Sequence, residues 1–497
     1  MSSTKQPPSR KAKTNSLPTE VLLIIFQQVY LVDQDLRNLD PTETFSSSHW
    51  HQRSRRLSPT ADLFPYALAS VSPIWRDVMS MAPHFWTRLV VTLDAHDNAL
   101  TGLPLHLLWS QDLPIDVHFT PVQNPAAHDR ERSCVEMAMN ALAPHLHRCR
   151  KLEILVSHSS SLPPTIRDAL RGDTPNLETL VIESDAYDGC RMPSCNSGAM
   201  HRWYLHAPQL KTVSLDGESI SLFARHWQPS RSFISRNLDR LTLSNYDAPV
   251  HQTPSMTVSD LIHALLGTRI RHLTLRHLYF NLTPRSPTAY NSRWAPLTLE
   301  LEDMQEEVIA RIHSKINGFV ESLTISNCPI SSIVRFKGRV LKLVQVTGKA
   351  ESAIQALTYW TGGELFLIRC SWADDTFIDA LADEHAADMG FMCSSLTHLH
   401  VRDCPNVSIR ALRKMVEKRW EAAATEASWN GVWHIDVGDS TTIRPVLSLD
   451  IVGGPCPSER DNAWFKSKLA DFSWTPSSST TSSSTLWRPL SYLQKWS

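Results

Sequence analysis

The sequence predicts an α+β chain in which a small helical module at the N-terminus is followed by an irregular α/β solenoid. Three observations lead to this prediction. An unusually apolar run occupies residues 17–26, the motif L-x-x-L-x-L recurs along the chain, and helical patterns fill the intervals between its copies. We expect a disordered basic tail at 1–15, the helical module at 16–90, the solenoid at 91–455, and a Ser/Thr-rich linker and tail at 456–497.

The first expected element is a helix that begins in the run Leu17–Phe26. Ser16 can cap this helix, and Pro18 suits its first turn, where a missing N–H costs nothing. All six residues of Val21–Phe26 are apolar, and six residues at about 100° each pass round the whole helix. Such a helix needs cover on every side. Its own domain can cover one side, and the rest indicates a protein partner; the alternative is a helix buried entirely within its own domain.

A second helical block follows at Phe64–Val78. Ser72 and Pro73 form a typical helix start, and apolar residues then recur at helical spacing until Pro83. The segment His84–Leu89 completes the block.

Three fragments of these blocks carry a family resemblance. They read L-P-x-E-V-L from Leu17, A-L-A-x-V-S-x-x-W-R-x-V from Ala67, and A-P-x-F-W-x-x-L from Ala82. In this order they resemble an F-box of the kind abundant in mushroom-forming fungi, and the match covers Leu17–Leu89. The F-box of that family is a small helical module that docks onto the Skp-family adaptor of cullin–RING ubiquitin ligases.

The resemblance implies which side chains contact the adaptor. We expect contacts from Leu17, Pro18, Val21, Leu22, Ile25 and Phe26, with Trp75, Val78 and Trp86 bracing the module or joining the contact. The sequence departs from the family through an insertion at Leu31–Asp62, which is polar and has no sustained period. We expect this insertion to be a surface excursion.

Strand and helix patterns alternate after the module. Residues 89–93 and 115–120 read as strands, and residues 100–110 and 131–148 read as helices. This alternation predicts a parallel sheet flanked by helices.

The repeat L-x-x-L-x-L is clearest at residues 176–182, 237–243, 269–275 and 395–401. With looser copies included, the central apolar positions are Leu155, Leu180, Val213, Leu241, Leu273, Leu299, Leu323, Val344, Leu365 and Leu399. Cysteine follows three of them at Cys328, Cys370 and Cys404, which resembles cysteine-type leucine-rich repeats. We therefore expect about ten irregular repeats, with these thiols packed in the core.

In such a repeat the leucines point inward and the residues between them face the concave surface. On the cleanest copies these residues are Thr179, Val181 and Glu183; His272, Thr274 and Arg276; and His398, His400 and Arg402. We expect target contacts from His272, Arg276, His398, His400 and Arg402. Because Arg suits carboxylate and phosphate groups, the hypothesis is an acidic or phosphorylated target segment; the alternative is that these are merely solvated sheet positions.

Composition limits the function classes. A net charge of −1 argues against a general nucleic-acid or anionic-membrane binder. Nine scattered cysteines fit reduced thiols, and no secretory or membrane-spanning segment is evident, so we expect a cytoplasmic or nuclear protein.

No metal site, cofactor or catalytic site is expected. Cys190 and Cys195 with His201 and His206 nearby do not have the usual zinc spacing. No phosphate-binding loop, nucleophile elbow or H-E-x-x-H motif occurs.

By resemblance, the chain is expected to be a non-catalytic substrate receptor of an Skp–cullin–F-box ubiquitin ligase. Its F-box would bind the adaptor, and through it the cullin and RING subunits, while the repeats hold an unknown target protein. One alternative is an F-box and leucine-rich-repeat scaffold that does not promote degradation. Another is an enzyme whose active site is assembled from distant residues.

Overall fold

The computed structural model describes residues 17–38, 64–93, 100, 102–121, 128–162, 172–186, 205–216, 219, 237–247, 256–265, 269–280, 295–316, 318, 320–330, 334–385, 390–430, 443–454 and 456–476. The chain divides into two compact units, Met1–Pro296 and Leu297–Ser497, which are described separately. The predicted basic tail at 1–15 and the part of the predicted linker and tail from residue 477 onward lie outside the described residues, as do Cys190, Cys195 and His201.

Four helical elements lie at the start of the described part of the first unit. They are α1 (Thr19–Asn38), α3 (Tyr66–Ala69), α4 (Pro73–Ser80) and the 3₁₀ helix η3 (Pro83–Trp86). Helix α4 starts as the sequence predicts: Pro73 occupies its first turn, and the backbone N–H of Trp75 donates to the Ser72 hydroxyl at 3.2 Å. The four elements share one core, made of Leu22, Phe26, Ala69, Val78, Met79, Ala82, Phe85 and Trp86.

Helix α1 is longer than the apolar run that predicts it. It continues to Asn38, so the first eight residues of the expected insertion are helical rather than irregular. Its buried column Leu22–Phe26 extends to Tyr30, whose ring packs against Phe64 and Phe85 at centroid distances of 5.6 and 5.5 Å. This aromatic contact stabilises a part of the helix that has little apolar periodicity of its own. Residues 39–63 lie outside the described part of the chain.

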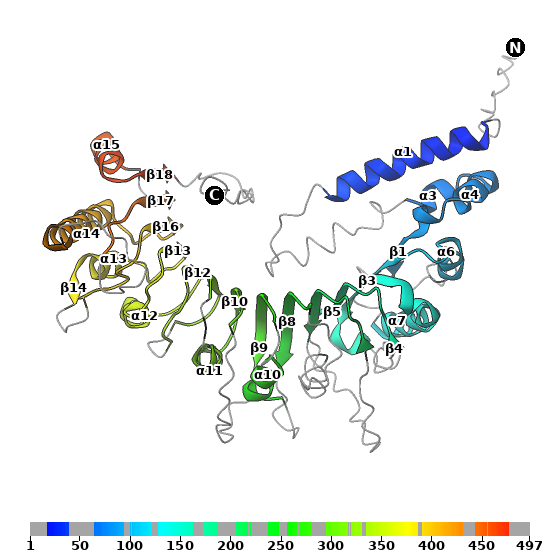
Figure 1. The fold of residues 1–497 in the computed structure, drawn as a ribbon, viewed down its shortest axis with the longest axis horizontal. Helices are drawn as coiled ribbons and strands as arrows, with labels where there is room; N and C mark the ends of the chain where they lie inside the picture. The colour runs from blue at the N-terminus through cyan, green and yellow to red at the C-terminus, as the bar shows by residue number, and fades with distance from the viewer. Residues whose placement is uncertain are drawn as a thin grey trace, which may run out of the picture. The chain divides into compact units, whose positions relative to one another are not determined.

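Seven parallel strands make up the sheet of the first unit, each paired with the next in chain order (Figure 1). They are β1 (Arg88–Thr92), β2 (Ile115–Thr120), β3 (Cys149–His158), β5 (Thr179–Ala186), β7 (Thr212–Asp216), β8 (Arg240–Asp247) and β9 (His272–Tyr279). The connecting helices include α6 (Leu103–Trp109), α7 (His128–Leu142) and α10 (Val258–Leu265), and the two-residue strands β4 (Gly172–Asp173) and β6 (Leu205–His206) pair with each other.

One predicted helix is divided. The sequence predicts a single helix at 131–148, but α7 ends at Leu142 and the 3₁₀ helix η5 (Ala143–Arg148) follows it. Pro144 accounts for the change because it cannot donate the hydrogen bond that an α-helix requires there.

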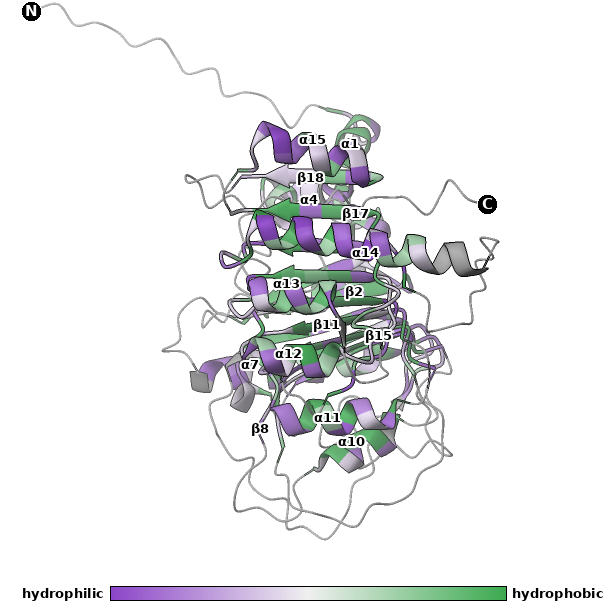
Figure 2. Ribbon diagram, turned by 90° about the vertical axis from the view of Figure 1, so that its left-hand side faces the viewer, coloured by the Kyte–Doolittle hydropathy of each residue, from purple (hydrophilic) through white to green (hydrophobic). Residues whose placement is uncertain are grey.

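The second unit also contains seven parallel strands paired in chain order. They are β10 (Thr298–Glu302), β11 (Ser322–Ser326), β12 (Val340–Val344), β13 (Glu364–Ile368), β16 (His398–Arg402), β17 (Ser448–Val452) and β18 (Asp471–Thr475). Its helices are α11 (Glu306–Lys315), α12 (Ala350–Leu357), α13 (Asp375–Ala382), α14 (Ile409–Asn430) and α15 (Glu459–Lys468), and the short strands β14 (Glu384–His385) and β15 (Gly390–Phe391) form a hairpin. Apolar and polar residues alternate along α11, α12 and α13 (Figure 2), and the apolar ones are buried against the sheet.

The strand register corrects two positions of the predicted repeat. Leu180 pairs with Leu152 rather than with Leu155, and Leu323 and Leu365 both pair with Leu341 rather than with Val344. Both errors are shifts of three residues. Because side chains alternate between faces, an odd shift moves a residue to the opposite face of the sheet. Leu155 and Val344 therefore point away from the leucine side.

The sheet also continues beyond residue 455, where we expected a linker to begin. Strand β17 ends before this boundary, and α15 and β18 then add one more strand–helix repeat, with Leu449 paired to Phe472. This repeat was not predicted, because α15 is mostly polar and Phe472 and Trp474 take the places of the leucines.

A repeated backbone conformation ends the strands of the second unit. Asp303, Asn327, Gln345, Arg369 and Asp403 all have positive φ, between 47° and 53°. The N–H of each donates to the last residue of the next strand at 2.8–3.0 Å. Immediately after three of these turns, Cys328, Cys370 and Cys404 are buried, and each thiol faces a carbonyl of the preceding strand. The expectation that they are core thiols is confirmed, and burial raises the pKa of Cys328 to about 11 and of Cys370 to about 12.

Candidate functional site

Helix α1 leaves an apolar stripe on its outer side. Leu17 just before the helix and Val21, Ile24, Ile25, Val29, Leu31 and Val32 within it are all exposed, Ile24 by 63% and Val32 by 57%. At about 100° per residue, Val21, Ile24, Ile25, Leu31 and Val32 lie on the half of the helix opposite Leu22, Phe26 and Tyr30, while Val29 lies at the edge of the buried face. We call this set the α1 stripe. An exposed apolar surface of this kind is typical of an interaction site.

The first turn of α4 and the residues that flank the helix expose further apolar side chains. Val71, Ile74 and Met81 are exposed by 56%, 44% and 67%. Helix α4 packs against α1 within the module, and its own inner face is occupied by Val78 and Met79.

The predicted adaptor-binding residues divide into two groups. Leu17, Pro18, Val21 and Ile25 are exposed, whereas Leu22, Phe26, Val78 and Trp86 lie in the core of the module. Trp75 is partly buried, with its ring 5.0 Å from that of Phe26. The Trp86 indole N–H donates to the Met79 carbonyl at 2.9 Å, which fixes it inside. These four buried residues therefore support the module. Ile24 and Val32, which are absent from the predicted set, are the most exposed members of the α1 stripe.

The helical module packs against the start of the sheet. The Trp86 ring lies 4.4 Å from Trp109 of α6, and the Tyr66 hydroxyl lies 2.8 Å from Nδ1 of His106. Burial lowers the pKa of His106 to about 4, so this imidazole is neutral at physiological pH.

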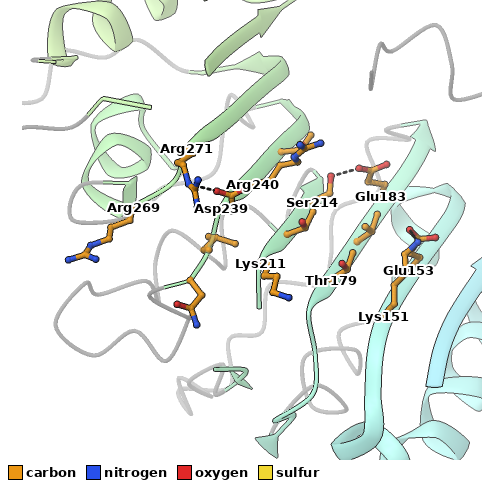
Figure 3. A pocket seen from close by; sticks show the side chains of 15 residues that line it. Lys151, Glu153, Thr179, Glu183, Lys211, Ser214, Asp239, Arg240, Arg269 and Arg271 are labelled. Carbon is orange, nitrogen blue, oxygen red and sulfur yellow. Dashed lines mark hydrogen bonds and ion pairs between the residues drawn. The ribbon is translucent and has the colours of Figure 1, made fainter. Parts of the chain in front are cut away.

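The second candidate surface is a groove of about 750 Å³ on the sheet face opposite the leucines, across β3, β5, β7, β8 and the start of β9. Its floor is built from the residues between the apolar positions: Glu153, Thr179, Val181, Glu183, Thr212, Ser214 and Thr242. Three of them, Thr179, Val181 and Glu183, are positions that the repeat pattern predicts to face outward. Basic side chains border the floor at the start of the strands, namely Lys151, Lys211, Arg240, Arg269 and Arg271 (Figure 3).

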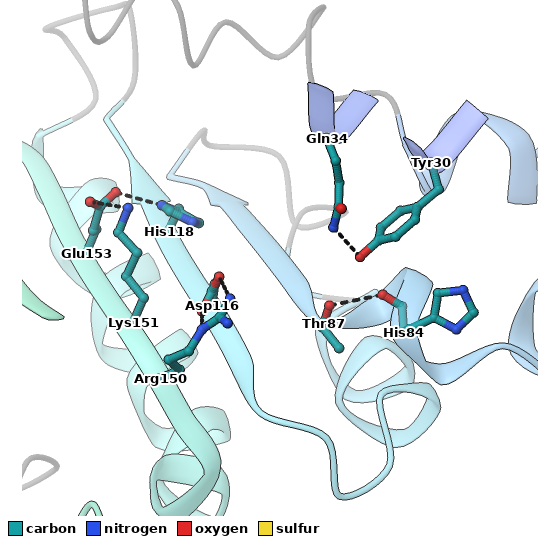
Figure 4. A network of polar contacts seen from close by, with 9 residues as sticks. All are labelled: Tyr30, Gln34, His84, Thr87, Asp116, His118, Arg150, Lys151 and Glu153. Atoms are coloured by element: carbon teal, nitrogen blue, oxygen red, sulfur yellow. Dashed lines mark hydrogen bonds and ion pairs between the residues drawn. The ribbon is translucent and has the colours of Figure 1, made fainter. Parts of the chain in front are cut away.

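A chain of polar contacts adjoins one end of the groove. Glu153 is buried between His118 and Lys151, at 2.7 Å from His118 Nδ1 and 2.8 Å from Lys151 Nζ (Figure 4). Beside it, Arg150 donates two hydrogen bonds to Asp116, at 2.9 and 2.6 Å. These contacts hold the charged side chains of β2 and β3 in fixed positions.

No family model matches this chain, and no curated protein matches it.

Two of the predicted target-binding residues lie beyond the groove in the first unit. His272 follows its border on β9 and is half-buried. Arg276, further along the same strand, is only 8% exposed. Its side chain is therefore mostly buried, and a contact between Arg276 and a target stays a prediction.

The other three belong to β16 of the second unit, where His400 takes part in an internal ion pair. Its ring nitrogens lie 3.4 Å from Glu364 and 3.5 Å from Asp450, and the ring stacks on Phe366 with centroids 4.1 Å apart. Burial disfavours the protonated ring, but hydrogen bonds with Asp450 and Glu364 outweigh burial and raise the pKa of His400. His400 is thus already engaged by carboxylates of its own chain. His398 is exposed at the start of β16, and partial desolvation of its ring lowers its pKa.

In the described part of the chain, no group of three or more His, Cys, Asp or Glu side chains is arranged to hold a metal ion. His206, part of the cysteine and histidine pattern, instead pairs with Asp173 at 2.9 Å. None of the described helices has the length and apolarity needed to cross a membrane.

Proposed function

We propose that the chain is a substrate receptor of an Skp–cullin–F-box ubiquitin ligase, with the helical module as its F-box and the sheet-bearing part as its target-binding region. The single observation that carries the proposal is the α1 stripe, which lies within the segment that resembles an F-box. Seven apolar side chains remain exposed there although the same helix has a complete buried face. Water contact with so much apolar surface is unfavourable, and a hydrophobic partner would remove it.

The mechanism requires no chemistry from this chain. A module packed against the sheet through Trp86 and Trp109 would hold a bound target at a fixed position relative to the adaptor. The ligase would then raise the effective concentration of a target lysine near the charged ubiquitin-conjugating enzyme.

Adaptor binding is tested by co-purifying the full-length chain with a recombinant Skp-family adaptor. The informative variant is Ile24→Asp with Ile25→Asp, because both side chains are exposed and the fold should tolerate the change. We expect loss of the complex, since two charges would have to be buried without partners. Leu108→Asp on α6 is the matched control, because Leu108 is 67% exposed but lies outside the α1 stripe. A wild-type chain that is folded and ignores the adaptor would refute the proposal.

Ligase activity separates this proposal from a scaffold role. The reconstituted complex with cullin, RING subunit, E1 and E2 enzymes should ubiquitinate a captured target. Stable capture of that target without ubiquitin transfer would instead favour a scaffold that does not promote degradation.

A further inference from the structure

Three acidic residues line the sheet-face groove. Glu153 and Glu183 are 2% and 6% exposed and lie at the floor, whereas Asp239 lies at the border in an ion pair with Arg271. Glu153 is held by His118 and Lys151, and Glu183 accepts a hydrogen bond from the Ser214 hydroxyl. The carboxylates of the floor are therefore already satisfied and do not define the charge that a ligand meets.

The basic residues stand at the border, where they are accessible. The side chains of Lys211 and Arg271 are 57% and 70% exposed. Each has an ion pair, Lys211 with Glu178 at 3.2 Å and Arg271 with Asp239 at 2.7 Å, but exposed pairs of this kind are weak and open to exchange. Arg269 extends away from the strands (Figure 3), and no salt bridge to it is found among the described residues. The surface that a ligand meets is thus predominantly positive.

The spacing of these cations indicates what kind of anion fits. From β3 to β9 there are four strand intervals of about 4.8 Å, so the basic border extends over roughly 19 Å. A single phosphate needs several donors that converge on one point. Cations spread along a border instead match carboxylates spaced along an extended polypeptide, of which about six residues would cover this length. The hydroxyl groups of Thr179, Thr212 and Thr242 add short polar groups to the floor.

We propose that this groove binds an extended acidic segment of a partner protein, through carboxylates that contact Lys151, Lys211, Arg240, Arg269 and Arg271. That the partner is a ubiquitination target rests on the function proposed above; the binding itself does not.

The test measures fluorescence anisotropy of a labelled peptide of alternating Glu and Gly, about 12 residues long so that it exceeds the groove when extended. The full-length chain is titrated into it, and a peptide with Gln in place of Glu serves as the neutral comparison. We expect binding of the Glu peptide only, weakening as NaCl rises from low concentration to 0.5 M.

Charge reversal then assigns binding to the groove. Lys211→Glu with Arg271→Glu should weaken peptide binding at least tenfold, because attraction becomes repulsion at two exposed points. The matched control is Arg339→Glu, an exposed arginine that precedes β12 in the second unit and pairs with Glu321 as Lys211 pairs with Glu178. This control should bind like the wild type. Circular dichroism and melting temperature of both variants confirm that they are folded.

Three outcomes would overturn the inference. They are equal binding of the Glu and Gln peptides, undiminished binding by the folded double variant, and measurable binding only of a phosphopeptide or an oligonucleotide. Adaptor co-purification is recorded separately for the same preparations. If the wild-type chain formed the adaptor complex but did not bind the Glu peptide, only this inference would be refuted. If it bound the Glu peptide but did not form the adaptor complex, only the proposed ligase function would be refuted.

Discussion

Two histidines of β16 show how the contacts of a single residue decide its pKa. His398 and His400 lie two residues apart on β16 and have the same intrinsic chemistry. Burial lowers the pKa of His398, whereas Asp450 and Glu364 raise that of His400. The repeat pattern placed both on the outer face, but it could not reveal which carboxylates of β13 and β17 would flank one of them.

The raised pKa of His400 has a definite consequence for stability. Its contribution should be fully present below the ordinary histidine pKa of 6.5 and should be lost as pH rises through the raised value in the folded protein. We expect backbone amides of β13, β16 and β17 to exchange faster at pH 8 than at pH 6, after correction for intrinsic exchange rates. His400→Gln should remove most of this difference. His398→Gln is the control and should retain it, and a titration of the His400 ring below pH 6.5 would contradict the prediction.

A buried histidine in the first unit should behave in the opposite way. Burial lowers the pKa of His106 to about 4, so the unfolded chain binds a proton between pH 6.5 and 4 that the native chain excludes. The free energy of unfolding should therefore fall with acidification over this range, by up to ~3 kcal/mol from this group. His106→Asn should reduce the acid sensitivity of amide exchange in α6 and β1. His147→Asn, at an exposed position, should leave it unchanged.

Whole elements were predicted well where apolar residues alone determine them. The helices α10, α11, α12 and α14 and most strands follow directly from their periodicity. The sequence also indicated that α1 would bury one side and expose the rest. The sequence could not show which residues of α1 are buried and which are exposed. Leu22 and Ile25 are equally apolar, and only packing in the core with Phe85 and Trp86 places Leu22 inside. The predicted strand registers were wrong at Leu155 and Val344, because neighbouring apolar residues allowed two alignments of the repeat.

The two sides of α1 should respond differently to truncation. Leu22→Ala removes packing at a side chain that is 1% exposed, and it should cost ~2–5 kcal/mol of module stability. Ile24→Ala, on the α1 stripe, should change stability by no more than ~0.5 kcal/mol. Hydrogen exchange of the segments at 19–38 and 66–86 measures both effects in the full-length chain. Equal destabilisation by the two variants would mean that the α1 stripe is covered within the chain.

At the scale of the whole molecule, the two ends of a repeated sheet face the same difficulty. Each strand–helix repeat is covered only by the neighbouring repeats, so the last repeat must cover the apolar surface of the one before it. In the second unit, α15 and β18 perform this role. Phe465 of α15 is fully buried and stacks on Phe472 of β18 at 4.9 Å, while Arg413 of α14 lies over the Trp464 ring at 4.6 Å. Short charged repeats like this one are hard to recognise from sequence because their apolar content is low.

Removal of the last repeat, α15 with β18, should destabilise the second unit. A chain truncated after Pro455 would expose the leucine side of β17 and leave its edge unpaired, which favours association between edges. We expect a lower melting temperature and increased light scattering on heating. A chain truncated after Pro476 is the matched control, since it keeps α15 and β18 and should melt like the full-length protein. Phe465→Ala tests the same contact without deletion and should cost ~3–5 kcal/mol. If the chain ending at Pro455 melted like the control, β17 would be a sufficient end for the sheet, and α15 with β18 would be free for another role.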